Sequence, residues 1–333
     1  MLFTKMMNLP EFKPRPPWLG GDLQTLRNMI VRPVVRLGHW SSSSLTFPQE
    51  DGDCLLGTLN QADKTGTHPL GLLLHGLTGS EDSLYMRCTA QTLLKEGRDV
   101  LRLNHRGAGP SGPLCRQSYH AGRTQDLRAV LGQLGQQWPT LKRRGVFLVG
   151  YSLGANMLLK FLGEGESPVP IRFAVSVSAP IDLLRTQEAI MRPRNRVYHS
   201  YLMNSMRREV MASAQPDEVR DRRWLMKLHS VWDFDEYLTA PRNGFAGARD
   251  YYNQNSALNF LDQVAVPCLV LHAQDDPWIP GSIYRGYDWR SNSTLSLVMP
   301  HSGGHVGFHG VGSQIPWHDR CTATFARGMS KAG

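Results

Sequence analysis

The hydrophobic residues of this chain gather in short continuous runs, separated by longer stretches in which apolar residues recur at helical spacing. A run of four or five successive apolar residues is typical of a strand covered on both faces. The runs predict strands at 70–74, 100–103, 146–149, 173–177, 268–271 and 295–298. The stretches between them predict helices at 83–96, 123–138 and 155–162. This βαβα order predicts a mainly parallel sheet with helices on both faces.

Two regions depart from this order: the N-terminal part up to residue 59 and the stretch between Pro180 and Pro267. Up to about Leu37 the chain is proline-rich, which predicts an arm packed on the body, with a helix at 23–30 capped by Asp22. The runs 44–47 and 54–59 flank a turn at Asp51-Gly52 and predict a β-hairpin on the antiparallel edge of the sheet.

The second region lies between Pro180 and Pro267, where only helix-like stretches rich in methionine and aromatic residues occur. These side chains could line an acyl pocket or simply pack a helical cap onto the sheet. We therefore expect an N-terminal arm at 1–43, an α/β core at 44–180 and 267–333, and a helical cap inserted at 181–266.

Composition adds limits to this picture. With 333 residues, 41% of them hydrophobic, the chain can bury a large core and is not a disordered or small disulfide-stapled protein. Five widely spaced cysteines without a CxxC pair favour reduced thiols, and the absence of a signal peptide or an 18-residue apolar run favours a cytoplasmic protein. A net charge of +9 suits peripheral contact with an anionic membrane. The arginines lack aromatic interleaving or a nucleic-acid motif, so no nucleic acid partner is expected.

A catalytic serine is the strongest chemical signal. The apolar run 146–149 leads directly into Gly150-Tyr151-Ser152-Leu153-Gly154 and then into a helical stretch. Gly-x-Ser-x-Gly between a strand and a helix is the context of a nucleophile elbow, in which the serine projects from a tight turn. Ser152 is therefore the predicted nucleophile.

A serine nucleophile needs a base and an acid that orients the base, and in such folds the chain order is serine, acid, histidine. The strand at 268–271 is followed by Asp275 and Asp276; Asp276 is favoured because Pro277 stiffens its loop, which leaves Asp275 a supporting role. A glycine-rich loop after the last strand carries His305, the predicted base.

That loop also carries His301 and His309, which gives the three histidines an i, i+4, i+8 spacing that a helical metal site could use. The glycines between them disfavour a helix, so these two histidines are expected at the surface or in support of the loop. No metal and no cofactor is implied.

Ester hydrolysis also needs donors for the oxyanion. One is expected from the Leu153 N–H, which follows the nucleophile, and the other from the Leu77 N–H in the loop His75-Gly76-Leu77-Thr78. The loop at 104–111 lacks a phosphate-binding fingerprint, and Arg106 in it is expected to be a structural hydrogen-bond donor.

These motifs together resemble the YheT-like branch of the α/β-hydrolase superfamily, close to the ABHD-type esterases. The resemblance is carried by segments 23–26, 75–80, 104–107, 119–122, 150–154, 250–252, 275–277 and 303–308. Ala155 departs from the family, which tends to have glycine there. The resemblance implies an α/β-hydrolase fold with a cap and a triad of Ser152, Asp276 and His305.

The sequence therefore predicts a serine carboxylesterase for short- to medium-chain acyl esters that acts through an acyl-enzyme. One alternative is a lipase or phospholipase that acts on acylglycerols or phospholipids at a membrane surface. Another, from a different class, is a catalytically silent binding protein with the same fold. The expected partner is a small-molecule ester or an acyl lipid.

Overall fold

The computed structural model describes residues 8–62, 68–214 and 217–331. Eight strands form one sheet in the order β1-β2-β4-β3-β5-β6-β7-β8. The strands are β1 (Ser41–Pro48), β2 (Cys54–Gln61), β3 (Leu70–Leu74), β4 (Val100–Leu103), β5 (Val146–Tyr151), β6 (Ile171–Val177), β7 (Cys268–Leu271) and β8 (Leu295–Val298). β1 and β2 pair antiparallel and β2 joins β4 antiparallel, whereas every other pair is parallel. The hairpin on the antiparallel edge and the six parallel strands predicted from the sequence are thus confirmed.

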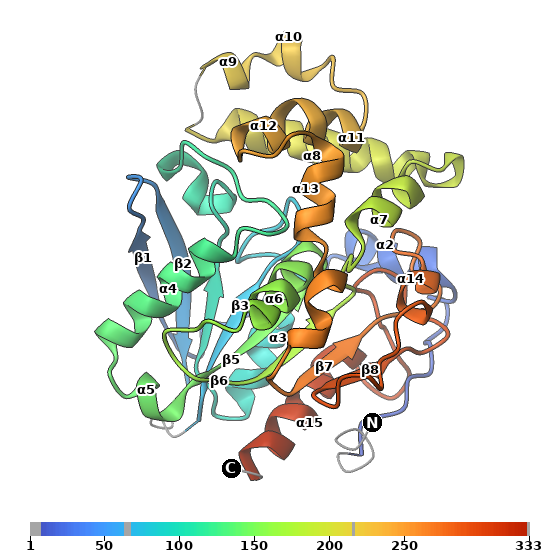
Figure 1. Ribbon diagram of the computed structural model, residues 1–333. Coiled ribbons are helices and arrows are strands. Elements are labelled where there is room, and N and C mark those ends of the chain that lie inside the picture. The colour runs from blue at the N-terminus through green and yellow to red at the C-terminus, as the bar shows by residue number, and fades with distance from the viewer. Residues whose placement is uncertain (1–7, 63–67, 215–216, 332–333) are drawn as a thin grey trace.

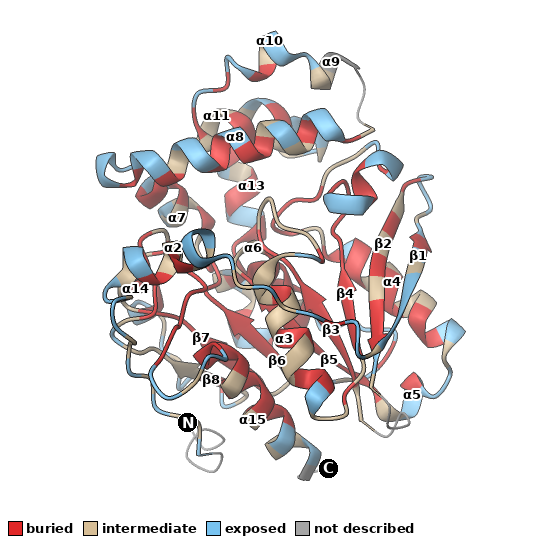
Figure 2. Ribbon diagram, turned by 180° about the vertical axis from the view of Figure 1, so that it is seen from behind, coloured by how far each residue is buried: buried red, intermediate tan, exposed pale blue. Residues whose placement is uncertain are grey.

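Helices cover both faces of the sheet, as the continuous apolar runs predicted. β3, β4, β5 and β7 are buried along their whole length. One face packs on α4 (Thr124–Gln137) and α6 (Leu153–Glu164), and the other on α3 (Leu84–Lys95) and α15 (Trp317–Lys331), which lie in front in Figure 2. Because the central strands are parallel, the loops at their carboxyl ends meet at one edge of the sheet.

The segment between β6 and β7, residues 181–266, contains helices and no strand among its described residues; we call it the cap segment. Its elements are α7 (Leu183–Ile190), η2 (Pro193–Asn195), α8 (Arg196–Ala212), α9 (Asp217–Arg220), α10 (Arg222–Leu225), α11 (Val231–Phe234), the π-helical turn η3 (Asp235–Thr239), α12 (Ala240–Arg242), α13 (Ala248–Asn255) and η4 (Ala257–Gln263). Figure 1 shows α8 to α12 at the top of the molecule, over the carboxyl ends of the strands. The division of the chain into arm, core and cap units stays a prediction.

The N-terminal arm lies against the loop that carries His305. Of the arm expected at 1–43, residues 1–7 lie outside the described residues. Pro14 forms a β-bridge with Gly310, and the helix α2 (Gly21–Val31) follows. The prediction that Asp22 caps this helix is wrong, because Gly20 is the N-cap residue. The Asp22 carboxylate instead accepts hydrogen bonds from Arg194 and Tyr198 of the cap segment.

Three short elements were not predicted from the sequence: η1 (Gly109–Leu114), α5 (Leu141–Arg144) and α14 (Gly281–Arg285). The C-terminal helix α15 was also missed, although it packs on α3 and completes one layer of the fold. Across the described residues, every helix is too short or too polar to cross a lipid bilayer.

Candidate active site

Ser152 lies at a sharp turn between β5 and α6. Its φ is 51° and its ψ is −122°, a combination that L-residues rarely adopt and that persists only where surrounding contacts fix it. Gly154 makes this turn possible, because a β-carbon there would lie 2.3 Å from the carbonyl oxygen of His75. The elbow thus needs glycine for close contact with the neighbouring loop.

His305, in the loop after β8, reaches Ser152 from the other side of the site. The distance from its Nε2 to the Ser152 Oγ is 3.0 Å, and that from its Nδ1 to the Asp276 Oδ2 is 2.8 Å. A carboxylate only accepts, so Nδ1 carries the ring proton of the neutral imidazole and Nε2 is free to accept the serine proton. The structure therefore brings together the three side chains that the sequence singled out.

Asp276 is anchored beyond its contact with His305. Its Oδ1 accepts hydrogen bonds from the N–H groups of Trp278, at 2.8 Å, and Ile279, at 3.0 Å. Burial alone would raise the pKa of Asp276, but the interaction and hydrogen bond with His305, together with His272 and the Ile279 N–H, lower the pKa below its usual value. Asp276 is thus held as a carboxylate. Asp275 has a different place, since its Oδ1 accepts from the Gly304 N–H at 2.9 Å.

Other groups that fix His305 were not recognised as part of the site from the sequence. The Thr25 hydroxyl accepts a hydrogen bond from the backbone N–H of His305 at 2.8 Å and donates one to the Gly21 carbonyl at 2.7 Å. The Trp278 ring stacks on the imidazole with centroids 4.3 Å apart. The segment 23–26 was noted only as part of the family resemblance, and its contact with residue 305 explains why it accompanies the catalytic motifs.

The two expected oxyanion donors lie beside Ser152 in the same cavity wall. Leu153 is the first residue of α6, and an amide in a first helical turn has no carbonyl partner within its own helix. The loop that carries Leu77 comes close to the nucleophile at Gly76, where a β-carbon would lie 3.0 Å from the Ser152 Cβ. Leu77 and Leu153 thus both lie near Ser152, and their role as oxyanion donors stays a prediction.

Two buried histidines hold the Leu77 loop. The His75 Nε2 accepts a hydrogen bond from the backbone N–H of His105 at 3.0 Å. The Nδ1 of His75 therefore carries the ring proton and donates to the Gly76 carbonyl at 2.8 Å. Burial lowers the pKa of His75 well below its usual value and that of His105 to about 4, which keeps both rings neutral. Because the peptide unit is planar and trans, a fixed Gly76 carbonyl also fixes the direction of the Leu77 N–H.

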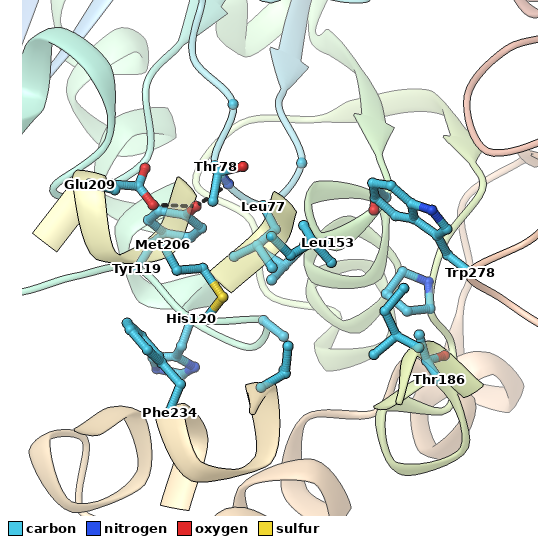
Figure 3. A pocket seen from close by; sticks show the side chains of 18 of the residues that line it. Leu77, Thr78, Tyr119, His120, Leu153, Thr186, Met206, Glu209, Phe234 and Trp278 are labelled. Carbon is cyan, nitrogen blue, oxygen red and sulfur yellow. Dashed lines mark hydrogen bonds between the residues drawn. The ribbon is translucent and has the colours of Figure 1, made fainter. Parts of the chain in front are cut away.

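A cavity of about 560 Å³ opens above the triad, between the core and the cap segment. Figure 3 shows its wall, with Leu77, Leu153, Met206 and Phe234 pointing into it. Most of the lining is apolar, as an acyl chain requires. The sequence left open whether the methionine and aromatic residues of this segment line a pocket or pack the cap. Met206, Tyr198 and Tyr201 line the cavity; the others pack within the cap segment (Met203, Trp224 and Trp232) or are exposed (Met191, Met211 and Met226).

The remaining residues named from the sequence have supporting places. Arg106 donates to Asp51, Asp53 and Asp126 and so connects the β1–β2 turn to α4, as expected of a structural donor. His301 is exposed, whereas His309 is buried and its backbone N–H donates to the Gln24 side chain at 2.6 Å. Within the described ranges, no group of three or more His, Cys, Asp or Glu side chains is arranged to hold a metal ion.

Comparison with known proteins places the chain among hydrolases. The family model described as serine aminopeptidase, S33, matches residues 68–282. YheT of Escherichia coli, which carries the provisional name of an esterase, is 30% identical over 308 residues, which cover 90% of this chain and 87% of its own. The monoacylglycerol lipase of Saccharomyces cerevisiae is 29% identical over 75% of this chain and 57% of its own. Phospholipase ABHD3 of Mus musculus is 28% identical over 80% of this chain and 65% of its own.

Solved structures show the same fold. The esterase Pf2001 of Pyrococcus furiosus superposes with a TM-score of 0.59 at 20% identity, over 87% of this chain and 93% of its own. The esterase Est1E of Butyrivibrio proteoclasticus, solved with ferulic acid bound, gives a TM-score of 0.56 at 15% identity, over 86% of this chain and 98% of its own.

Proposed function

Since the chain belongs to the serine aminopeptidase S33 family and has the α/β-hydrolase fold, we propose that it is a serine carboxylesterase that cleaves short- to medium-chain acyl esters through Ser152, His305 and Asp276. Two relatives that match 90% and 75% of this chain are named as an esterase and a lipase, and the enzyme is a carboxylic ester hydrolase. The observation that carries the proposed mechanism is the unbroken hydrogen-bonded path from the Ser152 Oγ through His305 to Asp276.

In the first half of the reaction, the Ser152 Oγ attacks the ester carbonyl carbon while its proton passes to the His305 Nε2. The carbonyl oxygen becomes an oxyanion, which accepts hydrogen bonds from the Leu77 and Leu153 amides. Asp276 stabilises the imidazolium. The bond from carbon to the alcohol oxygen then breaks, and His305 returns its proton to that oxygen, which releases the alcohol and leaves an acyl group on Ser152.

In the second half, a water molecule replaces the alcohol. His305 takes one water proton as the water oxygen attacks the acyl carbon, and a second oxyanion forms in the same place. Collapse of this intermediate breaks the bond to the Ser152 Oγ, which recovers its proton from His305. The products are a carboxylic acid and the free enzyme.

The proposal is tested with a fluorophosphonate probe and p-nitrophenyl esters of increasing chain length. The wild-type enzyme is expected to be labelled and to turn over esters, with Ser152→Ala unlabelled and slower by about 10⁶-fold. An unlabelled wild-type protein without turnover would favour a binding protein with this fold, and retention of most activity by Ser152→Ala would refute the nucleophile.

Action on lipid esters at an anionic membrane is a second candidate, which the exposed apolar residues at the cavity mouth favour. Met29 on α2 and Val197 on α8 both line the cavity and are 47% and 80% exposed, and the neighbouring Ile30 is 60% exposed. The ion pair between Asp22 and Arg194, at 2.8 Å, ties α2 to the turn before α8, so these side chains lie on adjacent elements. Exposed apolar groups beside arginines on a protein of net charge +9 are suited to an anionic lipid surface.

The two candidates differ in their response to aggregated substrate and salt. An interfacial enzyme should hydrolyse long-chain micellar esters faster than short soluble ones and should lose that advantage at high salt, since salt screens the attraction to anionic lipid. The Ile30→Ser and Val197→Ser variants should lose the advantage while keeping activity on short soluble esters. A preference for short chains that salt does not change would exclude the interfacial candidate.

A further inference from the structure

Tyr119 belongs to the segment 119–122, which contributes no residue to the triad and neither of the two expected oxyanion donors. Its ring is buried beneath the Leu77 loop, stacked on His105 with centroids 5.3 Å apart and edge-on to His75 at 5.9 Å. Its hydroxyl points into the cavity wall between Thr78 and Glu209, as Figure 3 shows. These ring contacts fix the position of the Tyr119 hydroxyl.

The hydrogen bonds of this hydroxyl have a fixed direction. The Thr78 N–H donates to the Tyr119 oxygen at 2.7 Å, and an amide can only donate. The Tyr119 proton is therefore directed at the Glu209 Oε2, 3.0 Å away. Glu209 lies on α8, so this path connects a cap helix to the loop that carries an oxyanion donor.

We propose that Tyr119 and Glu209 are positioning residues that aim the Leu77 N–H at the oxyanion, and that the site is therefore competent only while α8 is seated over the core. This inference rests on the proposed function. It assigns a role in the esterase reaction to two residues that contact neither Ser152 nor His305 among the hydrogen bonds of the described chain.

The geometry of the loop supports this role. The peptide unit before the Leu77 Cα is fixed by the bond from His75 to the Gly76 carbonyl, and the unit after it is fixed by the bond from the Thr78 N–H to Tyr119. Two planar units held from outside leave the Leu77 backbone little freedom. Thr78 has a φ of 57°, which a residue with a β-carbon keeps only where its surroundings hold it.

Apolar contacts support the same connection to the cap segment. The Leu77 side chain packs against two clusters of the cap segment, which contain Met206 and Leu202 of α8. Glu209 follows Met206 by three residues and therefore lies on the same side of the helix. One face of α8 thus supplies both the apolar cover and the polar anchor of the loop.

The protonation of Glu209 fits a site where negative charge develops. Burial raises the pKa of Glu209 to about 8, so the group is mostly neutral at pH 7. The carbonyl oxygen of a neutral carboxyl still accepts the hydrogen bond from the Tyr119 hydroxyl, without placing a negative charge near the loop that carries the Leu77 N–H.

The experiment measures kcat and KM for p-nitrophenyl butyrate with the wild-type enzyme, Tyr119→Phe, Glu209→Leu, Glu209→Gln and the Tyr119→Phe/Glu209→Leu double variant. Tyr119→Phe and Glu209→Leu should each lower kcat about fivefold to tenfold, the loss expected for one hydrogen bond, with KM changed less than about twofold. Glu209→Gln should recover most of kcat, because its amide oxygen still accepts from Tyr119. The double variant should be no slower than about the slower single variant, since both act through one path.

A second measurement separates positioning from general packing. A trifluoromethyl ketone forms an oxyanion on Ser152, so Tyr119→Phe should weaken its inhibition about as much as it lowers kcat, whereas a non-reactive amide of the same shape should bind as in the wild-type enzyme. The inference is overturned if kcat is unchanged in Tyr119→Phe, if only KM rises, or if Glu209→Gln is as slow as Glu209→Leu. A wild-type enzyme without esterase activity would instead refute the proposed function.

Discussion

Replacing Asp276 by asparagine changes one atom in the acid of the triad, and the structure shows how this change would reach the nucleophile. The Oδ1 accepts two backbone N–H groups, from Trp278 and Ile279. An asparagine keeps those contacts by placing its oxygen at this position, which turns its NH₂ group toward the His305 Nδ1. The imidazole must then accept at Nδ1 and carry its proton on Nε2, so it cannot take the proton of Ser152.

The size of the effect follows from that tautomer change. The corresponding substitution in a serine protease lowers kcat by about 10⁴-fold, a cost of about 5.5 kcal/mol in transition-state stabilisation. The Asp276 Oδ2 lies 2.8 Å from the His305 Nδ1, within hydrogen-bond distance, as the tautomer argument requires. We therefore expect kcat of Asp276→Asn to fall by about 10⁴-fold, with little change in KM.

The assay is steady-state hydrolysis of p-nitrophenyl butyrate at pH 7.5, with urea unfolding as a check on stability. Asp275→Asn is the matched control, because an asparagine oxygen can still accept the Gly304 N–H and this variant should stay within about threefold of the wild-type enzyme. A folded Asp276→Asn enzyme with more than about a tenth of wild-type kcat would show that Asp276 does not set the His305 tautomer, as would an equal loss in the control.

Three further changes test the supporting structure. Thr25→Val removes the acceptor of the His305 N–H and should lower kcat about tenfold in the same esterase assay, whereas Thr25→Ser should restore it; equal activity of both variants would contradict this role. Arg106→Met removes the ion pairs that Arg106 forms with the buried Asp53 and Asp126 carboxylates, while Asp126 keeps its ion pair with Arg123, and should lower the free energy of unfolding in urea by about 3 kcal/mol; an unchanged midpoint would contradict it. Glu209 ionises near pH 4.3 when unfolded but only at about 8 when folded, so the unfolded state binds fewer protons between those values and the free energy of unfolding falls as pH rises, by at most about 1.4 kcal/mol per pH unit. Urea unfolding at pH 5 and pH 8 should show a smaller fall for Glu209→Gln; the other buried carboxyl of the cavity, Asp235, is common to both proteins, and equal falls would exclude a raised pKa for Glu209.

The parallel sheet and the placement of the triad could be predicted because their signals are local. A continuous apolar run such as 268–271 indicates a strand by itself, and the position of Asp276 after that run already assigns it to the carboxyl edge of the sheet. Ser152 carries its own signal in the two glycines that flank it. The chain order of the three residues then needs only the sheet to bring them together.

The residues that the sequence did not reveal act through contacts between distant parts of the chain. Thr25 and His305 are 280 residues apart, and nothing near either one indicates the other. Glu209 lies on a helix whose seating over the core no periodicity determines, so its contact with Tyr119 appears only in the folded structure. Asp22 shows the opposite error, because a residue with good capping chemistry is used for an ion pair between elements.

Trapping a covalent intermediate on Ser152 tests whether this serine is the nucleophile. The enzyme is mixed rapidly with excess p-nitrophenyl ester and quenched in acid within milliseconds. It is then digested, and the peptide masses are measured by mass spectrometry. We expect a burst of about one p-nitrophenol per enzyme and an acyl group on Ser152, both absent from Ser152→Ala. An acyl group on another residue would contradict the assignment of Ser152 as the nucleophile. Turnover without an acyl group on Ser152, in both the wild-type enzyme and a His305→Ala variant, would also contradict this assignment.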